Sequence, residues 1–400
     1  MTARPSFPAL AEARPEEVGL SAAGLARLSR ALTTRIERGH IPGAVALIAR
    51  GGRLAFHEAF GARDPAAAGD PMRTDAIFRI YSMTKPIVSV AAMMLWEEGR
   101  FLLGDPVPRT IPDFAAPKVL SAQAGKTEPV PAQRAITVQD LLRHTSGLTY
   151  EFLGGGPVHR AYMDAKIYRR RQTNADQAAM LGKLPLLYQP RTRWEYSRST
   201  DVVGHLVEVL SGEPLGPFLQ RRILGPLGMA DSGFYVPADA QNRLAGGFGT
   251  DPETGADVPL LDVREAPSFE SGGGGMVSTA LDYARFLQML LDGGALNGER
   301  LLGRKTIELM TADHLGGMPA NADLLPPGHG FGLGFAVRLV AGLAPFPGSV
   351  GSYFWGGAAG TTFWVDPAEG LIAVLMIQAP GQREHYRVLF RDLVYAAIAD

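Results

Sequence analysis

The sequence predicts an α/β protein in which both ends of the chain build one sheet and a mainly helical region is inserted between them. Strand-like segments occur near the start, at residues 43–60, and again in the last third, at residues 332–378. The segment between roughly 100 and 260 has many prolines, short helical stretches and few strand-like runs. Strands at both ends around a helical middle indicate a single sheet formed by both termini.

The first predicted element is a hairpin. Residues 43–50 are rich in Val, Ile and Ala and end at Gly51-Gly52, and residues 53–60 then alternate apolar and polar side chains. Two such runs around a glycine pair are typical of two antiparallel strands joined by a tight turn.

The next predicted element is a buried helix over residues 86–98. It has no charge until its last turn and is apolar nearly all round, which places it in a protein interior. Pro86 is tolerated in a first turn, and Gly99 is a plausible stop. Ser82 therefore lies at or just before the helix N-terminus, where free N–H groups and the helix dipole favour developing negative charge.

The rest of the chain contains shorter elements. Helical patterns cover residues 138–143 and 201–210, and an amphipathic helix at 279–291 follows a glycine run, 272–275, that we interpret as flexible. The last third predicts strands at 332–340, 352–356, 361–365 and 371–378, a turn at 366–370 and a closing helix at 386–398.

The composition of the chain excludes several classes of function. A chain of 400 residues with 46% hydrophobic content is ample for a large core and suggests two or three structural units. A formal net charge of -1 without runs of like charge argues against a nucleic-acid binder or a polybasic membrane anchor. The absence of cysteine removes disulfides, thiolate catalysis and thiolate metal sites.

The chain ends carry no targeting signal that we recognise. The N-terminal residues lack a basic region followed by an apolar core, as a secretory signal would have. The apolar run at 371–377 is too short to span a bilayer. We therefore expect a cytoplasmic protein that does not insert into membranes.

Three segments carry candidate chemistry. Lys85 follows Ser82 by three residues, so one helical turn places its amine on the same face as the hydroxyl, and no other lysine follows a serine at this spacing. Tyr196, near a cationic amine, could have its pKa lowered enough to exchange protons with a serine. Gly356 and Gly357 would let another backbone approach Trp355, and an N–H group there could help bind an oxyanion. Taken alone, Tyr196 is typical of an aromatic side chain that only packs in the core, and the two glycines are typical of a β-bulge without a role in binding.

Together these segments fall in the order and spacing of the serine β-lactamase and penicillin-binding protein superfamily, and the chain most closely resembles the family VIII carboxylesterases. That resemblance implies a β-lactamase/transpeptidase-like fold, with an antiparallel sheet flanked by helices. We expect a sheet domain of residues 1–75 and 262–400, a mainly helical domain of residues 76–261, and an active site at their junction. Supporting stretches lie at residues 15–21, 141–148, 271–276 and 331–335.

The resemblance also implies roles for individual residues. Ser82 would be acylated, Lys85 and Tyr196 would form the base system as a coupled pair, and the N–H groups of Ser82 and Ala358 would form the oxyanion hole. The implied substrate-binding residues are Tyr150, Asp201, Trp355, Gly356 and Gly357.

Two departures from the penicillin-recognising pattern favour an ester over a lactam. Arg198 stands where an asparagine is usual, and Trp355 replaces the lysine of a Lys-Thr-Gly motif. Exchanging that lysine for tryptophan removes a cation and adds an apolar wall. The site should then prefer a neutral ester to an anionic substrate.

Other motifs are weak. No Gly-x-Ser-x-Gly occurs, which disfavours an α/β-hydrolase, and there is no His-Glu-x-x-His. His144 precedes Thr145-Ser146-Gly147, which resembles a structural turn of the superfamily, so Ser146 is not our nucleophile. We interpret residues 168–171, Tyr-Arg-Arg-Arg, as a solvated helix face that could alternatively contact a substrate.

The resulting prediction is a serine carboxylesterase without metal or cofactor that hydrolyses short- to medium-chain acyl esters through an acyl-enzyme on Ser82, with weak β-lactamase activity as a side reaction. An acyltransferase, D-amino-acid amidase or β-lactamase of the same fold is an alternative, and a non-catalytic binding relative is one of another class. The complete Ser-Lys-Tyr set favours the enzyme. The expected partner is a small ester, with no nucleic acid, and the oligomeric state stays open.

Overall fold

The computed structural model describes residues 10–67, 69–120, 128–321 and 323–400. Its main strands are β1 Ala11–Glu12, β2 Gly43–Arg50, β3 Arg53–Gly61, β10 His329–Phe331, β11 Ala336–Arg338, β12 Tyr353–Gly356, β13 Thr362–Asp366 and β14 Leu371–Ile377. Short two-residue strands form three further pairs: β4 Phe78–Arg79 with β7 Val277–Ser278, β5 Lys118–Val119 with β6 Val130–Pro131, and β8 Ala295–Leu296 with β9 Glu299–Arg300.

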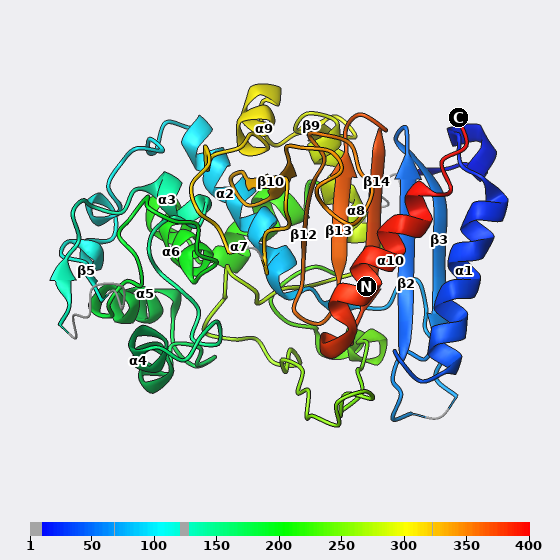
Figure 1. Ribbon diagram of the computed structural model, residues 1–400, viewed down its shortest axis with the longest axis horizontal. Helices are drawn as coiled ribbons and strands as arrows, with labels where there is room; N and C mark the ends of the chain where they lie inside the picture. Colours follow the sequence, from blue (N-terminus) through cyan, green and yellow to red (C-terminus); the bar gives the residue numbers. More distant parts are fainter. Residues whose placement is uncertain (1–9, 68, 121–127, 322) are drawn as a thin grey trace.

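The α-helices of the described residues are α1 Ala22–Glu37, α2 Thr84–Glu97, α3 Val138–Leu142, α4 Pro157–Ala165, α5 Asn174–Lys183, α6 Ser199–Ser211, α7 Leu215–Leu219, α8 Ala280–Leu291, α9 Arg304–Met310 and α10 Arg383–Tyr395. In Figure 1 the main sheet lies on the right, α3 to α6 form a helical region on the left, and α2 runs between the two. None of these helices is long and apolar enough to cross a membrane.

The main sheet has eight strands in the order β1-β3-β2-β14-β13-β12-β11-β10. Three strands come from the start of the chain and five from its end, which confirms a sheet built from both termini. The prediction of a purely antiparallel sheet is wrong at one edge, because β1 pairs with β3 in parallel. Helix α1 leads from β1 to β2, which runs in the opposite direction, and the hairpin turn then brings β3 back parallel to β1.

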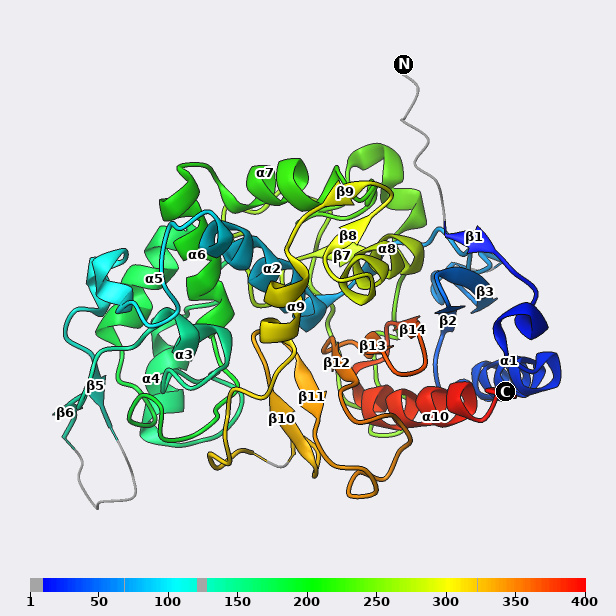
Figure 2. The same ribbon diagram turned by 90° about the horizontal axis from the view of Figure 1, so that it is seen from above.

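Both faces of the central strands are buried. Along β2, Val45 and Leu47 pack in one apolar cluster, whereas Ala46 and Ile48 pack in another. Figure 2 shows the two layers responsible: α1 and α10 cover one face and α8 covers the other. This double cover explains why β2 reads as a continuous apolar run, since alternation marks only strands with one solvated face.

One predicted strand is confirmed only in part. The predicted strand at 332–340 is a turn followed by β11, which pairs with the preceding strand β10. The turn is closed by a hydrogen bond of 2.8 Å from the Gly332 N–H to the Phe335 carbonyl. Gly334 has a φ of 104°, and a methyl group there would lie 2.6 Å from Ser89 Oγ on α2. A glycine that the turn requires had been included in a strand.

The buried helix is confirmed. A short 3-10 segment, Tyr81–Met83, leads into α2, whose residues 84–95 are all buried. The closing helix is also confirmed, although α10 begins at Arg383. The interpretation of residues 168–171 as a helix face is wrong, because they lie in the loop between α4 and α5.

Helix α1 was not predicted, although its signal is present. Ser21 accepts a hydrogen bond of 3.1 Å from the Gly24 N–H, as an N-cap residue does. Leu25, Leu28 and Leu32 recur at helical spacing and are buried against the sheet.

Candidate active site

Ser82 lies just before the N-terminus of α2, as the sequence predicts. It sits in the 3-10 segment that precedes the helix and is half-buried. The residue before it, Tyr81, has a φ of 42°, which is an unfavourable conformation for a residue with a side chain. The Tyr81 hydroxyl accepts a hydrogen bond of 2.8 Å from the Leu261 N–H, so a distant loop holds this strained residue in place.

Lys85 points its amine at Ser82. Its Nζ lies 3.3 Å from Ser82 Oγ, 2.9 Å from the Tyr150 hydroxyl and 2.5 Å from the Gly273 carbonyl oxygen. A neutral amine has two N–H groups and one lone pair. If the two N–H groups donate to Tyr150 and Gly273, the lone pair remains for the Ser82 hydroxyl proton. This geometry suits a general base.

Burial makes the neutral amine accessible at ordinary pH. The Lys85 side chain is fully enclosed, and desolvation lowers its pKa from 10.5 to about 7. The negative charge of Asp201 opposes this shift, and the positive charge of Arg198 adds to it. A lysine with a pKa near 7 is partly neutral without any other base, which is how enzymes tune such groups.

The glycine run at 272–275 forms part of the site and is tightly packed, so its interpretation as flexible is wrong. A methyl group on Gly273 would lie 2.8 Å from Asp201 Oδ2 and 2.9 Å from the Tyr150 hydroxyl. A methyl group on Gly272 would lie 2.5 Å from the Thr200 carbonyl. Only glycine lets this backbone reach Lys85. The Gly273 carbonyl is a functional group that side-chain motifs could not show.

Asp201 lies behind the site. Its Oδ1 accepts hydrogen bonds of 2.5 Å from the Ser271 hydroxyl and 2.9 Å from the Gly273 N–H, and its side chain is buried. This carboxylate therefore fixes the loop that offers the Gly273 carbonyl to Lys85. The structure places Asp201 away from solvent, so its geometry suits positioning of the loop better than the predicted contact with substrate.

Tyr196 joins the same cluster from the segment before α6. Its hydroxyl accepts a hydrogen bond of 3.1 Å from Trp355 Nε1 and shares one with Ser82. Lys85 Nζ lies 4.4 Å from the centre of the Tyr196 ring, so the ammonium form would make a cation–π contact. Ser82, Lys85 and Tyr196 are thus brought together as expected.

The expected lowering of the Tyr196 pKa is contradicted. Burial raises its pKa well above 10, and the hydrogen bonds from Ser82 and Trp355 oppose this shift only in part. The apolar surroundings that make Lys85 easier to deprotonate also make the phenol harder to ionise, because both effects disfavour charge. Lys85 is therefore better suited to accept the first proton, and Tyr196 is better suited to remain protonated and donate a proton.

Tyr150 is held between the base and a buried ion-pair network. Its ring lies 4.7 Å from the Arg198 guanidinium, which pairs with Glu151 and, at 3.4 Å, with Asp201. Burial raises the Tyr150 pKa well above 10. The departure at position 198 therefore places a cation in a network behind Tyr150.

The strand end at Trp355-Gly356-Gly357 approaches the start of α2, as the glycines predict. A methyl group on Gly357 would collide with the Ile80 carbonyl oxygen, and the Thr361 hydroxyl donates to that same oxygen at 3.4 Å. Ala358, the next residue, is exposed. This contact places the segment containing Ala358 against the chain two residues before Ser82, which suits the predicted oxyanion hole.

Arg387 of α10 was missed by the sequence analysis. Its guanidinium donates to the Gly357 carbonyl oxygen and pairs with Glu384 at 2.8 Å. A methyl group on Gly356 would lie 2.6 Å from that guanidinium. Strand β12 has lost the lysine usual in this region, but the closing helix brings a cation behind its end. Arg387 is far in sequence from the candidate motifs, so no sequence pattern connected it with the site.

His144 and Ser146 have structural roles. Ser146 is buried and its hydroxyl lies 2.7 Å from Ser199 Oγ, while His144 Nδ1 lies 3.1 Å from Ser197 Oγ. Burial holds the His144 pKa well below its usual value, so the ring is neutral. Within the described residues no group of His, Cys, Asp or Glu could hold a metal ion.

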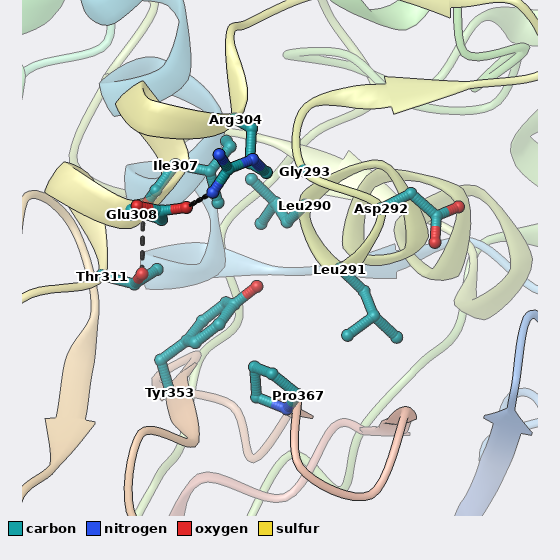
Figure 3. A pocket seen from close by; sticks show the side chains of 10 residues that line it. All are labelled: Leu290, Leu291, Asp292, Gly293, Arg304, Ile307, Glu308, Thr311, Tyr353 and Pro367. Carbon is teal, nitrogen blue, oxygen red and sulfur yellow. Dashed lines mark hydrogen bonds and ion pairs between the residues drawn. The ribbon is translucent and has the colours of Figure 1, made fainter.

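A separate hollow of about 450 Å³ lies between α8, α9 and the β13–β14 turn (Figure 3). Leu290, Leu291 and Tyr353 line it, and Arg304 pairs with Glu308 at its upper rim in the figure. Neither Ser82 nor Lys85 belongs to its lining. This hollow therefore lies apart from the proposed nucleophile and base.

A family model described as Beta-lactamase matches residues 28–396. The chain belongs to the beta-lactamase family. It is a hydrolase of the serine beta-lactamase-like superfamily with the β-lactamase/transpeptidase-like fold.

Several known proteins are similar to this chain over most of its length. Protein Rv1367c of Mycobacterium tuberculosis (strain ATCC 25618 / H37Rv) is 38% identical, over 86% of this chain and 87% of its own. Esterase EstB of Burkholderia gladioli is 34% identical, over 96% of this chain and 98% of its own. The solved structure titled "EstCE1, a hydrolase with promiscuous acyltransferase activity" matches with a TM-score of 0.79 at 30% identity, covering 93% of this chain and 99% of that one.

Proposed function

We propose that this protein is a serine carboxylesterase that hydrolyses short- to medium-chain acyl esters through an acyl-enzyme on Ser82. The observation that carries the proposal is the enclosed Lys85 amine, 3.3 Å from Ser82 Oγ, with a pKa lowered to about 7 by burial. The similarity to Esterase EstB over nearly the whole chain supports an ester as the substrate.

In the first half-reaction Ser82 Oγ attacks the ester carbonyl carbon while neutral Lys85 accepts the hydroxyl proton. The N–H groups of Ser82 and Ala358 stabilise the oxyanion that forms. As the intermediate collapses, the carbon–oxygen bond to the alcohol breaks. Tyr196 gives its proton to the departing alkoxide and regains one from Lys85, so the alcohol leaves neutral.

In the second half-reaction water attacks the acyl-enzyme. The Lys85–Tyr196 pair takes a proton from the water, and the same two N–H groups hold the new oxyanion. Collapse breaks the bond to Ser82 Oγ, which recovers its proton, and the carboxylic acid leaves. No metal or cofactor is needed at any step of this scheme.

Trp355 supports a neutral ester over an anionic lactam. Its indole N–H is occupied by the Tyr196 hydroxyl, and its ring lies 5.2 Å from the Tyr196 ring. The tryptophan therefore presents apolar surface where related enzymes carry a lysine. Arg387 lies nearby, but Glu384 and the Gly357 carbonyl already pair with it.

The test compares p-nitrophenyl butyrate and nitrocefin on the wild type, on Ser82→Ala and on Ser89→Ala. We expect fast butyrate cleavage, slow or no nitrocefin cleavage, and loss of both in Ser82→Ala. Ser89 lies on α2 with no hydrogen-bond partner for its buried hydroxyl, so its replacement controls for a serine lost from this helix. Butyrate hydrolysis that survives in Ser82→Ala would sink the proposal.

An acyltransferase is the second candidate, favoured by the printed title of EstCE1. An acyl-enzyme enclosed by aromatic side chains can be attacked by an alcohol in place of water. Adding 1-butanol to the reaction distinguishes the two activities, because a transferase would divert product toward the butyl ester. An unchanged yield of free acid would exclude transfer to this alcohol.

A further inference from the structure

Three large apolar side chains are exposed together near the active site. Phe152, Met163 and Tyr168 are 66%, 53% and 55% exposed. All three line one hollow of about 410 Å³, whose other lining residues are Glu151, Asp164 and Lys166. We call it the apolar hollow. Single exposed apolar residues are ordinary, but several lining one concave surface indicate a binding site.

The apolar hollow adjoins the catalytic cluster. The Phe152 ring stacks on the Tyr150 ring, with centroids 4.8 Å apart and planes inclined by 25°. The Tyr150 hydroxyl lies 2.9 Å from Lys85 Nζ, which in turn contacts Ser82. One aromatic ring therefore separates the hollow from the proposed base, a separation that an ester's side group can span.

The fold holds the walls of the hollow in place. Phe152 lies in a turn closed by a hydrogen bond of 3.3 Å from the Leu153 N–H to the Tyr150 carbonyl. Met163 is carried by α4. The loop containing Tyr168 is tied to another segment, because the Arg170 carbonyl accepts hydrogen bonds from two successive N–H groups, those of residues 268 and 269.

The charges around the hollow suit a neutral occupant. Glu151 is 9% exposed and its carboxylate pairs with Arg198, so it offers no free charge. Asp164 and Lys166 are exposed and have opposite signs. An ionic ligand would therefore gain little electrostatic binding energy in the hollow. An alkyl chain or an aryl ring, in contrast, would cover apolar surface that is now in contact with water.

We propose that the apolar hollow binds the acyl chain of the ester and sets the preference for longer acyl chains, an inference that rests on the proposed esterase function. Phe152 and Tyr168 are its specificity-determining residues. An acetyl ester is too short to use the hollow, whereas a longer chain leaving Ser82 past Tyr150 would lie against Phe152.

The test measures kcat/KM for p-nitrophenyl acetate and octanoate on the wild type, Phe152→Ala and Tyr168→Ala. We expect the octanoate value to fall about tenfold in Phe152→Ala and the acetate value to change less than about twofold, as truncation of one apolar contact predicts. Leu102→Ala is the matched control, because Leu102 is 67% exposed and is not part of the lining. A parallel series of ethyl and octyl acetate tests the alcohol side, and a loss in Phe152→Ala that is confined to octyl acetate would overturn the assignment of the acyl chain to the hollow.

Equal losses for acetate and octanoate would indicate a structural role and overturn the inference, as would an unchanged octanoate value. Binding of 1-octanol, measured by calorimetry on the wild type and Phe152→Ala, separates this inference from the proposed function. Weaker octanol binding in the variant supports the hollow even in a protein that hydrolyses no ester. Equal binding overturns the hollow even where Ser82→Ala abolishes esterase activity.

Discussion

At the scale of single residues, one environment acts in opposite directions on two neighbouring groups. Burial lowers the pKa of Lys85 to about 7 and raises that of Tyr196 well above 10. The lysine is thereby prepared to accept a proton and the tyrosine to keep one. In the proposed mechanism this division assigns the Ser82 proton to Lys85.

The division predicts the pH dependence of esterase activity. Lys85 must be neutral to accept a proton, so kcat/KM should fall as the pH drops below about 7 and level off above it, because more of the amine is protonated in acid. A stopped-flow profile of kcat/KM from pH 5 to 10 with p-nitrophenyl butyrate measures this dependence. Tyr196→Phe should lower the rate yet keep this acid limb. Activity that continues to climb toward pH 10 would assign the first proton transfer to a phenol instead.

Sequence reasoning found the residues whose chemistry resides in a side chain at a short spacing. Ser82 and Lys85 share one helix face, so their meeting follows from local geometry. The Gly273 carbonyl and Arg387 could not be found in this way. The first acts through a backbone oxygen that any residue carries, and the second reaches Gly357 only because α10 packs beside the sheet.

At the scale of elements, the end of β12 depends on the absence of side chains. Gly357 lies against the Ile80 carbonyl, and Gly356 lies against the Arg387 guanidinium. Each glycine thus admits a different neighbour, one from the nucleophile segment and one from the closing helix. The strand end can present Ala358 to a substrate only while both contacts persist.

This arrangement predicts that Gly357→Ala impairs catalysis. The added methyl group would displace the strand end from Ile80 and with it the Ala358 N–H group. We expect kcat for p-nitrophenyl butyrate to fall about 100-fold with a smaller change in KM, as loss of one oxyanion donor does. Gly249→Ala is the control, since a methyl group at Gly249 meets nothing within 4 Å. Equal kcat values in the two variants would remove the Ala358 N–H from the mechanism.

Most elements with a strong local pattern were predicted, with α1 as the exception, and elements set by tertiary contacts were not. The hairpin β2–β3 and the buried helix α2 carry clear apolar patterns and were found. The strand assigned to 332–340 is confirmed only in part, and the helix face assigned to 168–171 was wrong. In the first case Gly334 turns the chain over α2, and in the second the loop is held by a segment about 100 residues away.

At the scale of the whole molecule, the segment that precedes α1 meets the C-terminal residues at one edge of the structure. The Ser21 N–H donates to the Ala397 carbonyl at 2.7 Å, and α1 packs on α10, where a methyl group at Gly24 would lie 2.7 Å from the Ala397 side chain. Helix α10 also holds the end of β12 through Arg387. The last helix therefore helps to cover one face of the sheet and also holds the end of β12 at the proposed site.

Arg50 at the end of β2 joins these parts and provides a test of stability separate from catalysis. Its guanidinium donates to the Val18 and Gly19 carbonyls, each at 3.1 Å, and to the Glu369 carbonyl at 3.0 Å, and it pairs with the Glu369 and Asp400 carboxylates. These acceptors belong to the N-terminal segment, the β13–β14 turn and the chain end.

We expect Arg50→Ala to lower the free energy of unfolding by about 2–4 kcal/mol, because the side chain is only 12% exposed and several charge-assisted hydrogen bonds are lost together. Thermal unfolding followed by circular dichroism measures the change. Arg53→Ala is the matched control, since Arg53 is 44% exposed. Its guanidinium pairs with Glu17 and donates to the Glu12 carbonyl oxygen at the surface, where ion pairs contribute about 0–1 kcal/mol. Arg50 touches no residue of the site, so kcat/KM at 25 °C should be the same in both variants. A large loss of activity in a folded Arg50→Ala protein would instead show that closure of the chain ends shapes the site through α10.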